Sequence, residues 1–222
     1  MILFQIVVEL KGPILRGRDI KRYSYTWANL YIIATFPALH LDIEKYPAVK
    51  KHLLSFGMQR LEQTGKAYLV NGEKITARKR TGNKWFETQD QIGYWDDFSE
   101  QKIVWGNLAL SAQFASAPGG LFVNAPCPMI VPFNGYLLAV LNSKLCDWYI
   151  RQLGVTRNGG YFEYKPMFIE QLPVPNIVCK TAKTLASLTE KPTLENQIEI
   201  DRLVFELFGL EKREIALISA SH

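Results

Sequence analysis

The sequence predicts an α+β fold, in which an irregular β-rich body with a few helices is followed by a C-terminal α-hairpin. Short apolar and aromatic runs fill the first 135 residues, and Gly, Pro, Asn and Asp repeatedly interrupt them. From Gly135 onward apolar residues recur at helical spacing, and another helical pattern begins at Ile200. We therefore expect two domains, a body over residues 1–178 and a helical packing or docking element over residues 179–222.

Six runs in the body are predicted strands, because each is short and rich in β-branched or aromatic residues. They are Ile2–Val8, Leu30–Thr35, Trp85–Glu87, Lys102–Trp105, Leu121–Asn124 and Met129–Val131. Their irregular spacing argues against alternating βαβ units. One predicted helix interrupts them, from Pro47 to about Arg60, and Pro47 suits its first turn.

A second helix is predicted from about residue 135 to 153, with Asn134 as its cap. Its residues divide into an apolar face and a polar face. The apolar face holds Leu138, Leu141, Leu145, Trp148 and Tyr149, and the polar face holds Lys144, Asp147 and Arg151. Further on, Gly209 is expected to end a helix that begins near Ile200, and Glu211 to begin a shorter one.

The charge is unevenly distributed along the chain. Residues 1–189 carry 22 basic and 14 acidic side chains, whereas residues 190–222 carry 4 basic and 7 acidic ones. The body therefore has a net charge of +8 and the tail one of −3. A basic body suits a polyanionic partner such as a nucleic acid.

Several other classes of protein are disfavoured. Cys127, Cys146 and Cys179 form no Cys-x-x-Cys pair, so neither a disulfide framework nor a zinc knuckle is expected, and a reducing cytoplasm fits best. The three histidines lack metal-ligand spacing, which predicts no metal site. The sequence has no run of about 18 apolar residues, so no membrane span is expected. Gly-x-Gly, P-loop and Gly-x-Ser-x-Gly motifs do not occur in it.

The segment from Lys11 to Tyr23 has the densest basic cluster, with Gly17 between two arginines. Cations neutralise phosphates, and a glycine lets a polyanion approach the backbone closely. The alternative is a solvated charged turn. A second cluster runs from Lys74 to Lys84 and leads into Trp85 and Phe86, which could stack on bases or simply belong to the core.

A third element is Arg157-Asn158-Gly159-Gly160-Tyr161. Arg and Asn side chains can read guanine and adenine edges with paired hydrogen bonds. A tight turn that needs positive φ at its glycines is the alternative, and the two interpretations are compatible.

A metal-dependent nuclease is the main alternative function. Glu100-Gln101-Lys102 follows several carboxylates, and such a triplet can hold a metal in nucleases. The residues involved would be Asp90, Asp96 or Asp97 with Glu100 and Lys102. Ordinary roles at a strand edge are favoured for Glu100 and Lys102. A module that docks an acidic protein partner is a third possibility.

Seven segments, in this order, carry a resemblance to a known family. They are Leu15–Tyr23, Tyr46–Lys50, Lys84–Glu87, Gln101–Trp105, Tyr136–Lys144, Leu172–Pro175 and the tail Leu203–Ile215. The chain resembles the TaqI-like C-terminal specificity domain, which is the target-recognition domain of adenine-N6 DNA methyltransferases and of fused type IIG restriction enzymes. The resemblance covers about residues 13 to 218.

The resemblance implies a double-β-helix-like body and terminal helices. It also implies that the domain reads double-stranded DNA for a methyltransferase domain, which lies N-terminal to it or in a separate subunit acting in trans. That partner would bind S-adenosylmethionine and carry an Asn/Asp-Pro-Pro-aromatic motif. This chain has no Pro-Pro pair, so we expect no catalytic residue and no cofactor in it.

The candidate DNA-binding residues follow from the three basic elements. The cations of the first two would contact phosphates, and the third, with Trp85, would contact bases. The full set is Arg16, Arg18, Lys21, Arg22, Tyr23, Arg78, Lys79, Arg80, Lys84, Trp85, Arg157, Asn158, Gly159 and Gly160.

Overall fold

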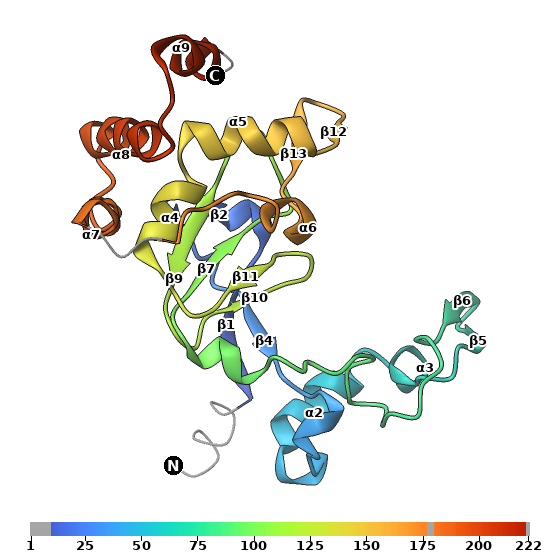
Figure 1. Cartoon of the computed structure of the whole chain (residues 1–222). Coiled ribbons are helices and arrows are strands. Elements are labelled where there is room, and N and C mark those ends of the chain that lie inside the picture. Colours follow the sequence, from blue (N-terminus) through green and yellow to red (C-terminus); the bar gives the residue numbers. More distant parts are fainter. Residues whose placement is uncertain (1–9, 177–179, 221–222) are drawn as a thin grey trace. The chain divides into compact units, whose positions relative to one another are not determined.

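The computed structural model describes residues 10–176 and 180–220, so the predicted strand Ile2–Val8 lies outside the described residues. The described chain is an α+β protein with several small sheets (Figure 1). It divides into two compact units. The first contains Tyr31–Trp95 and the segment that ends at Pro13, and the second contains Ile14–Leu30 and the chain from Asp96 onward. The boundary predicted at residue 178 falls outside the described residues and stays a prediction.

The first unit consists of short helices and one two-stranded ribbon. Its elements are β4 (Tyr31–Ile33), η2 (Pro37–Leu39), η3 (Ile43–Lys45), α2 (Pro47–Leu54), α3 (Met58–Leu61), β5 (Ala67–Val70) and β6 (Glu73–Thr76). The first half of β1 (Lys11–Leu15) pairs antiparallel with β4. Ile43, Val49 and Phe86 form the buried cluster of this unit.

The second unit contains the larger core and the remaining strands. They are β2 (Ile20–Lys21), β3 (Ser24–Tyr25), β7 (Lys102–Trp105), β8 (Leu108–Ala109), β9 (Phe114–Ala117), β10 (Phe122–Val123), β11 (Met129–Ile130), β12 (Thr156–Arg157) and β13 (Tyr161–Glu163). At its centre β7 lies between β11 and β9, and both pairings are antiparallel. The second half of β1 pairs with β10 in parallel, and β12, β13 and β8 form another sheet. Two 3-10 turns, η1 (Gly17–Asp19) and η4 (Asp96–Ser99), complete this part.

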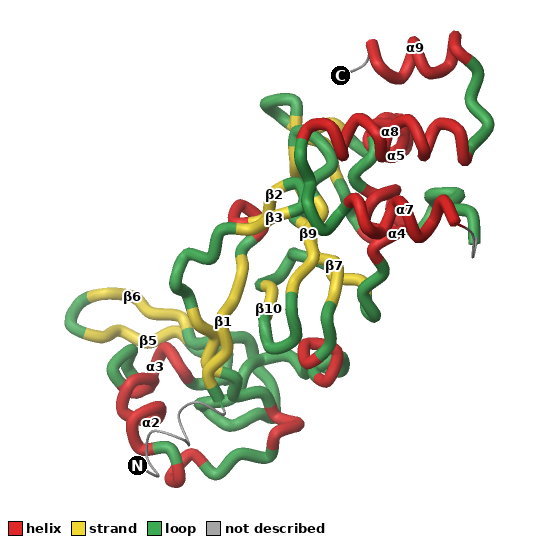
Figure 2. The backbone as a smooth tube through the Cα atoms, turned by 90° about the vertical axis from the view of Figure 1, so that its left-hand side faces the viewer, coloured by secondary structure: helices red, strands yellow, loops and turns green. Residues whose placement is uncertain are grey.

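Helices cover one side of the second unit. They are α4 (Gly135–Leu141), α5 (Lys144–Leu153), α6 (Pro166–Ile169), α7 (Lys180–Leu188), α8 (Leu194–Leu207) and α9 (Lys212–Ala220). Figure 2 shows α4, α5, α7 and α8 grouped at this side, where α4 packs on α7 and α8 packs on both α5 and α7. Their shared buried cluster includes Val140, Leu185, Ile200 and Val204.

Two predicted helices are each divided in the structure. Gly57 separates α2 from α3 and precedes α3 with φ of +87°, a non-helical conformation that glycine adopts without a steric penalty. The predicted helix over residues 135–153 is broken at Asn142, and the Ser143 side chain then accepts a hydrogen bond from Cys146 N at the start of α5. Asn134 caps α4 as predicted.

The polar face predicted for this helix is wrong at Asp147. This carboxylate is buried, and it accepts hydrogen bonds from Ala112 N at 2.7 Å and from the Tyr164 hydroxyl. Arg151 forms an ion pair with it at 2.9 Å. A charged residue can occupy the buried side of a helix when distant backbone and hydroxyl donors satisfy it.

The α+β class is confirmed, but two finer predictions are not. The strands of residues 10–176 and 180–220 form five small sheets, and a double-β-helix-like winding is not confirmed. Both C-terminal helices exist on either side of Gly209, yet α8 and α9 each pack on α5, so the predicted hairpin is not confirmed. Residues Trp85–Glu87 form a turn rather than the predicted strand. Within the described ranges, no helix is long and apolar enough to cross a lipid bilayer.

Candidate nucleic-acid interface

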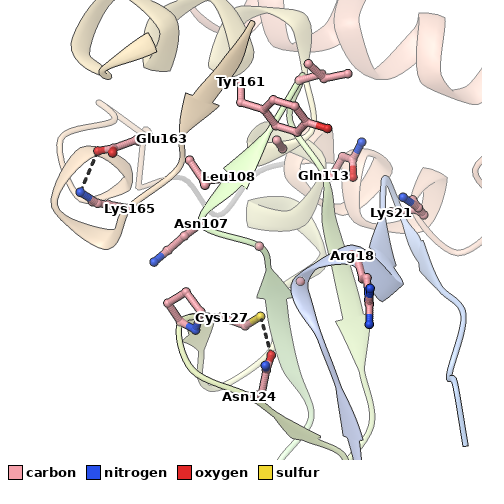
Figure 3. Close-up of a pocket in the computed structure, with 15 residues that line it drawn as sticks. Arg18, Lys21, Asn107, Leu108, Gln113, Asn124, Cys127, Tyr161, Glu163 and Lys165 are labelled. Carbon is pink, nitrogen blue, oxygen red and sulfur yellow. Dashed lines mark hydrogen bonds and ion pairs between the residues drawn. The ribbon is translucent and has the colours of Figure 1, made fainter. Parts of the chain in front are cut away.

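A pocket of about 660 Å³ opens in the second unit (Figure 3). Four chain segments form its walls: the η1 region, the turn and strand that follow β7, the segment between β10 and β11, and the β13 strand with Lys165. Its polar lining consists of Arg18, Lys21, Asn107, Gln113, Asn124, Tyr161, Glu163 and Lys165. We refer to this cavity as the Arg18 pocket.

The turn at η1 presents two cations to the Arg18 pocket. Arg18 and Lys21 are exposed and line the pocket, and within the described chain no ion pair engages either side chain. Arg16 has a different role, because its guanidinium holds Asp19 through two hydrogen bonds of 2.8 and 2.9 Å. These bonds lower the pKa of Asp19 below its usual value. Arg16 thus shapes the turn, while Arg18 and Lys21 face solvent.

Close backbone packing holds the η1 turn against the β7–β8 turn. A Cβ atom added to Gly106 would lie 3.3 Å from the Cα and carbonyl oxygen of Gly17. A Cβ atom on Gly17 would lie 3.4 Å from Cys127 Sγ. The close approach expected at Gly17 therefore serves, in this structure, the packing of one turn on another.

Arg22 and Tyr23 contribute to the core of the second unit. Arg22 Nη2 donates to the carbonyl oxygen of Asn142 at 2.6 Å. Tyr23 has φ of 61° and packs against both large core clusters, and burial raises the pKa of its hydroxyl to about 12. Their predicted contacts to DNA stay a prediction.

The Arg157 element forms the β12–β13 hairpin. Asn158, Gly159 and Gly160 are exposed in its turn, where both glycines have positive φ, as the turn interpretation predicted. Arg157 Nε donates to Glu163 Oε1 at 2.6 Å. Tyr161, 43% exposed, lines the Arg18 pocket. The hairpin thereby carries an aromatic ring into the same cavity as Arg18.

Glu163 is the anchor of this hairpin. Its carboxylate is buried and is held by Lys165 Nζ at 2.8 Å as well as by Arg157. The hydrogen bonds from Lys165 and Arg157 lower the pKa of Glu163. The sequence offered no signal for Asn107 or Gln113 as pocket residues. Lys165 could have been predicted as a candidate binding residue, because it is a cation that closely follows the short strand Tyr161–Glu163.

The second basic cluster lies in the first unit. Arg78 donates to the carbonyl oxygens of Leu61 at 2.9 Å and Glu87 at 2.8 Å, and also to that of Trp85. Lys79 and Arg80 are exposed, and so is Lys84. Trp85 is half-buried and packs edge-on against buried Phe86 with 5.5 Å between the ring centroids. Arg78 and Trp85 therefore support the local fold.

The structure gives no support to the nuclease alternative. Lys102 is fully buried, and its ammonium donates to the carbonyl oxygens of Phe98, Glu100 and Pro118 at 2.7 to 3.0 Å. An ammonium held in this way is not available to a phosphate. Among the described residues, no three His, Cys, Asp or Glu side chains cluster to form a metal site.

Comparison with known proteins points to one family. The sequence model of the TaqI-like C-terminal specificity domain matches residues 12–174. The chain is also 20% identical over 215 residues to the type II methyltransferase M.BstVI of Geobacillus stearothermophilus. That alignment covers 95% of this chain and 36% of the relative.

Proposed function

Because this chain belongs to the family of TaqI-like C-terminal specificity domains, we propose that it recognises a short sequence in double-stranded DNA. As a specificity domain of the restriction-modification type, it would supply sequence discrimination to a methyltransferase. The observation that carries the proposal is the Arg18 pocket, where exposed Arg18 and Lys21 lie beside Tyr161 and the polar side chains of Asn107 and Gln113.

These residue types divide naturally between two tasks. Arginine and lysine neutralise phosphates whatever the base sequence, whereas amide side chains donate to and accept from base edges. Tyr161 offers a partly exposed ring for stacking or for contact with sugars. Asn158 and the two glycines of the hairpin turn immediately precede Tyr161 in the sequence, and all three are exposed. A surface that carries both kinds of group can contact the phosphates of a duplex and its base edges.

We propose that methyl transfer takes place in another domain. The chain spans about a third of the length of the methyltransferase it matches. The partner would bind S-adenosylmethionine and would lie N-terminal to this domain or in a separate subunit. A target adenine would then leave the stack and enter that domain while the specificity domain holds the duplex.

The test is a titration of fluorescent duplex DNA at several salt concentrations. If about five phosphates are neutralised, log affinity should fall with log salt at a slope near −4.5. Arg18→Ala and Lys21→Ala should each make the slope shallower by about 1. Lys212→Ala, a matched change of a lysine in α9, should leave the slope unchanged.

Two outcomes would count against the proposal. Duplex binding without any salt dependence would exclude a phosphate-gripping surface. An equal effect of Lys212→Ala and Arg18→Ala would show that binding follows net charge and not the Arg18 pocket.

A further inference from the structure

The β5–β6 ribbon of the first unit exposes a large apolar side chain near its tip. Leu69 is 78% exposed, the highest value among the large hydrophobic residues of the described chain that are exposed. It lies two residues before the Asn71-Gly72 turn, where both residues have positive φ. This turn geometry is typical of a two-residue hairpin.

Alternation along the ribbon separates two faces. Tyr68 pairs with Ile75 and Leu69 pairs with Lys74. Ile75 is buried and the Tyr68 hydroxyl donates to Glu62 Oε2 at 2.5 Å, so this face is anchored to the unit. The opposite face carries Ala67, Leu69, Lys74 and Thr76, all of which are exposed. Leu69 therefore stands on a face with no packing role.

Charges around this face favour an anionic partner. Four exposed cations, Lys66, Lys74, Lys79 and Arg80, lie on or next to the two strands. Glu73 is the acidic residue of the ribbon, and Arg60 lies 3.4 Å from its carboxylate. An exposed leucine opposite Lys74, with further cations toward the base of the ribbon, suits a surface in which phosphates flank less polar base edges.

The base of the ribbon is held firmly by the rest of the unit. Ala77 N donates to Lys66 O and Gly65 N donates to Arg78 O, both at 2.8 Å, which extends the pairing beyond the strands. Arg78 then fixes three carbonyl oxygens of neighbouring segments. A ribbon held in this way presents Leu69 in a defined position without ordering on binding.

From these observations we propose that the β5–β6 ribbon enters the major groove of duplex DNA and places Leu69 against the methyl group of a thymine. The inference rests on the proposed function, since it assigns a specificity-determining residue to the same activity. The major groove, about 12 Å wide, admits a two-stranded ribbon, and the thymine methyl is exposed only there. The thymine methyl is the apolar group on the major-groove edges, and Lys74 and Lys79 would contact the flanking phosphates.

The experiment begins with a pool of duplexes selected from a random library by the wild-type chain. Affinity for the selected duplex is measured with thymine and again with uracil, which lacks the methyl group, at each thymine in turn. At one position the wild-type chain should lose about threefold to tenfold in affinity with uracil, and Leu69→Ala should be insensitive to that exchange. Leu194→Ala, which alters another exposed leucine (70%), should keep the wild-type response.

The outcomes separate the inference from the function on which it rests. If the wild-type chain selects no duplex and binds none in a salt-dependent manner, the proposed function fails. If it does bind, but thymine-to-uracil exchange has no effect or affects the wild-type chain and Leu69→Ala alike at every position, the inference alone is overturned. Because Leu69 is 78% exposed, Leu69→Ala should keep the thermal unfolding midpoint of the wild type, and Lys74→Ala should make the salt slope shallower by about 1.

Discussion

The side-chain amide of Asn142 forms hydrogen bonds with both the backbone N–H and the backbone carbonyl of Phe114. Phe114 N donates to Asn142 Oδ1 at 3.0 Å, and Asn142 Nδ2 donates to Phe114 O at 2.9 Å. The amide thus replaces a strand neighbour for β9 at the point where α4 ends and α5 begins. Asn142 and Phe114 are both buried, so water cannot take over either bond.

Asn142→Ala should therefore lower the free energy of unfolding by about 1–3 kcal/mol, because buried Phe114 N loses its acceptor and Phe114 O keeps only Tyr23 N as a donor. Chemical denaturation with urea would measure the change. Asn158→Ala is the matched control, since its exposed side chain should contribute less than about 0.5 kcal/mol. Equal stability of the two variants would contradict the assigned role of Asn142.

Local patterns were sufficient for some elements of the fold and not for others. The predicted strand Lys102–Trp105 coincides with β7, and Asn134 caps α4, because both depend on neighbouring residues. The break at Asn142 depends on a partner 28 residues away, and an apolar helical pattern continues through it. Asp147 looked like a polar-face residue for the same reason, because its partners Ala112 and Tyr164 belong to other segments.

The candidate site likewise combines features that local sequence patterns predict with features that depend on contacts between distant segments. Composition located the three basic elements, but it could not distinguish cations that bind backbone carbonyls from those that face solvent. Arg78 is held by Leu61 and Arg22 by Asn142, and these contacts exist only after folding. Asn107 and Gln113 join Arg18 in one pocket because the β7–β8 turn packs on η1, which no local pattern indicates.

Lys102 provides a second test of a buried polar contact. Lys102→Met shortens the side chain by one atom and removes the lysine donor from three carbonyl oxygens, so we expect a loss of about 2–4 kcal/mol in stability. Glu100→Ala changes an exposed neighbour and should be within about 0.5 kcal/mol of the wild type. Thermal and urea unfolding would measure both. Magnesium-dependent cutting of plasmid DNA that Glu100→Ala abolishes would restore the nuclease alternative.

Acid should weaken the anchoring of the β12–β13 hairpin. The pKa of Glu163 is lowered in the folded protein, so its contribution to stability is present above the pKa of the unfolded chain, about 4.3, and is lost as the pH falls through the folded value. Glu163→Gln should therefore be less stable than the wild type at pH 7, and the difference should shrink below pH 4.3 or so. Unfolding measured between pH 7 and pH 3 would show this convergence.

A matched change at Glu195 controls for general acid effects. Its pKa is also lowered, but by hydrogen bonds at the start of α8, so Glu195→Gln should leave the hairpin unaffected. Amide signals of Gly159 and Gly160, followed by NMR, should move with pH in the wild type and in Glu195→Gln. The assigned role of Glu163 would be wrong if those signals moved equally in Glu163→Gln.

Substitution of Arg78 should affect the stability of the fold, and substitution of Arg80 should affect DNA binding, although the two arginines lie two residues apart in one basic cluster. Arg78→Ala removes a partly buried guanidinium from three carbonyl oxygens, so we expect a loss of about 2–3 kcal/mol in stability. Arg80→Ala alters an exposed side chain and should leave stability within about 0.5 kcal/mol, while the salt dependence of duplex binding becomes shallower by about 1. Urea unfolding and duplex titrations on the same preparations would measure both effects. A stable Arg78→Ala variant with a shallower salt slope would instead place the Arg78 side chain on the DNA.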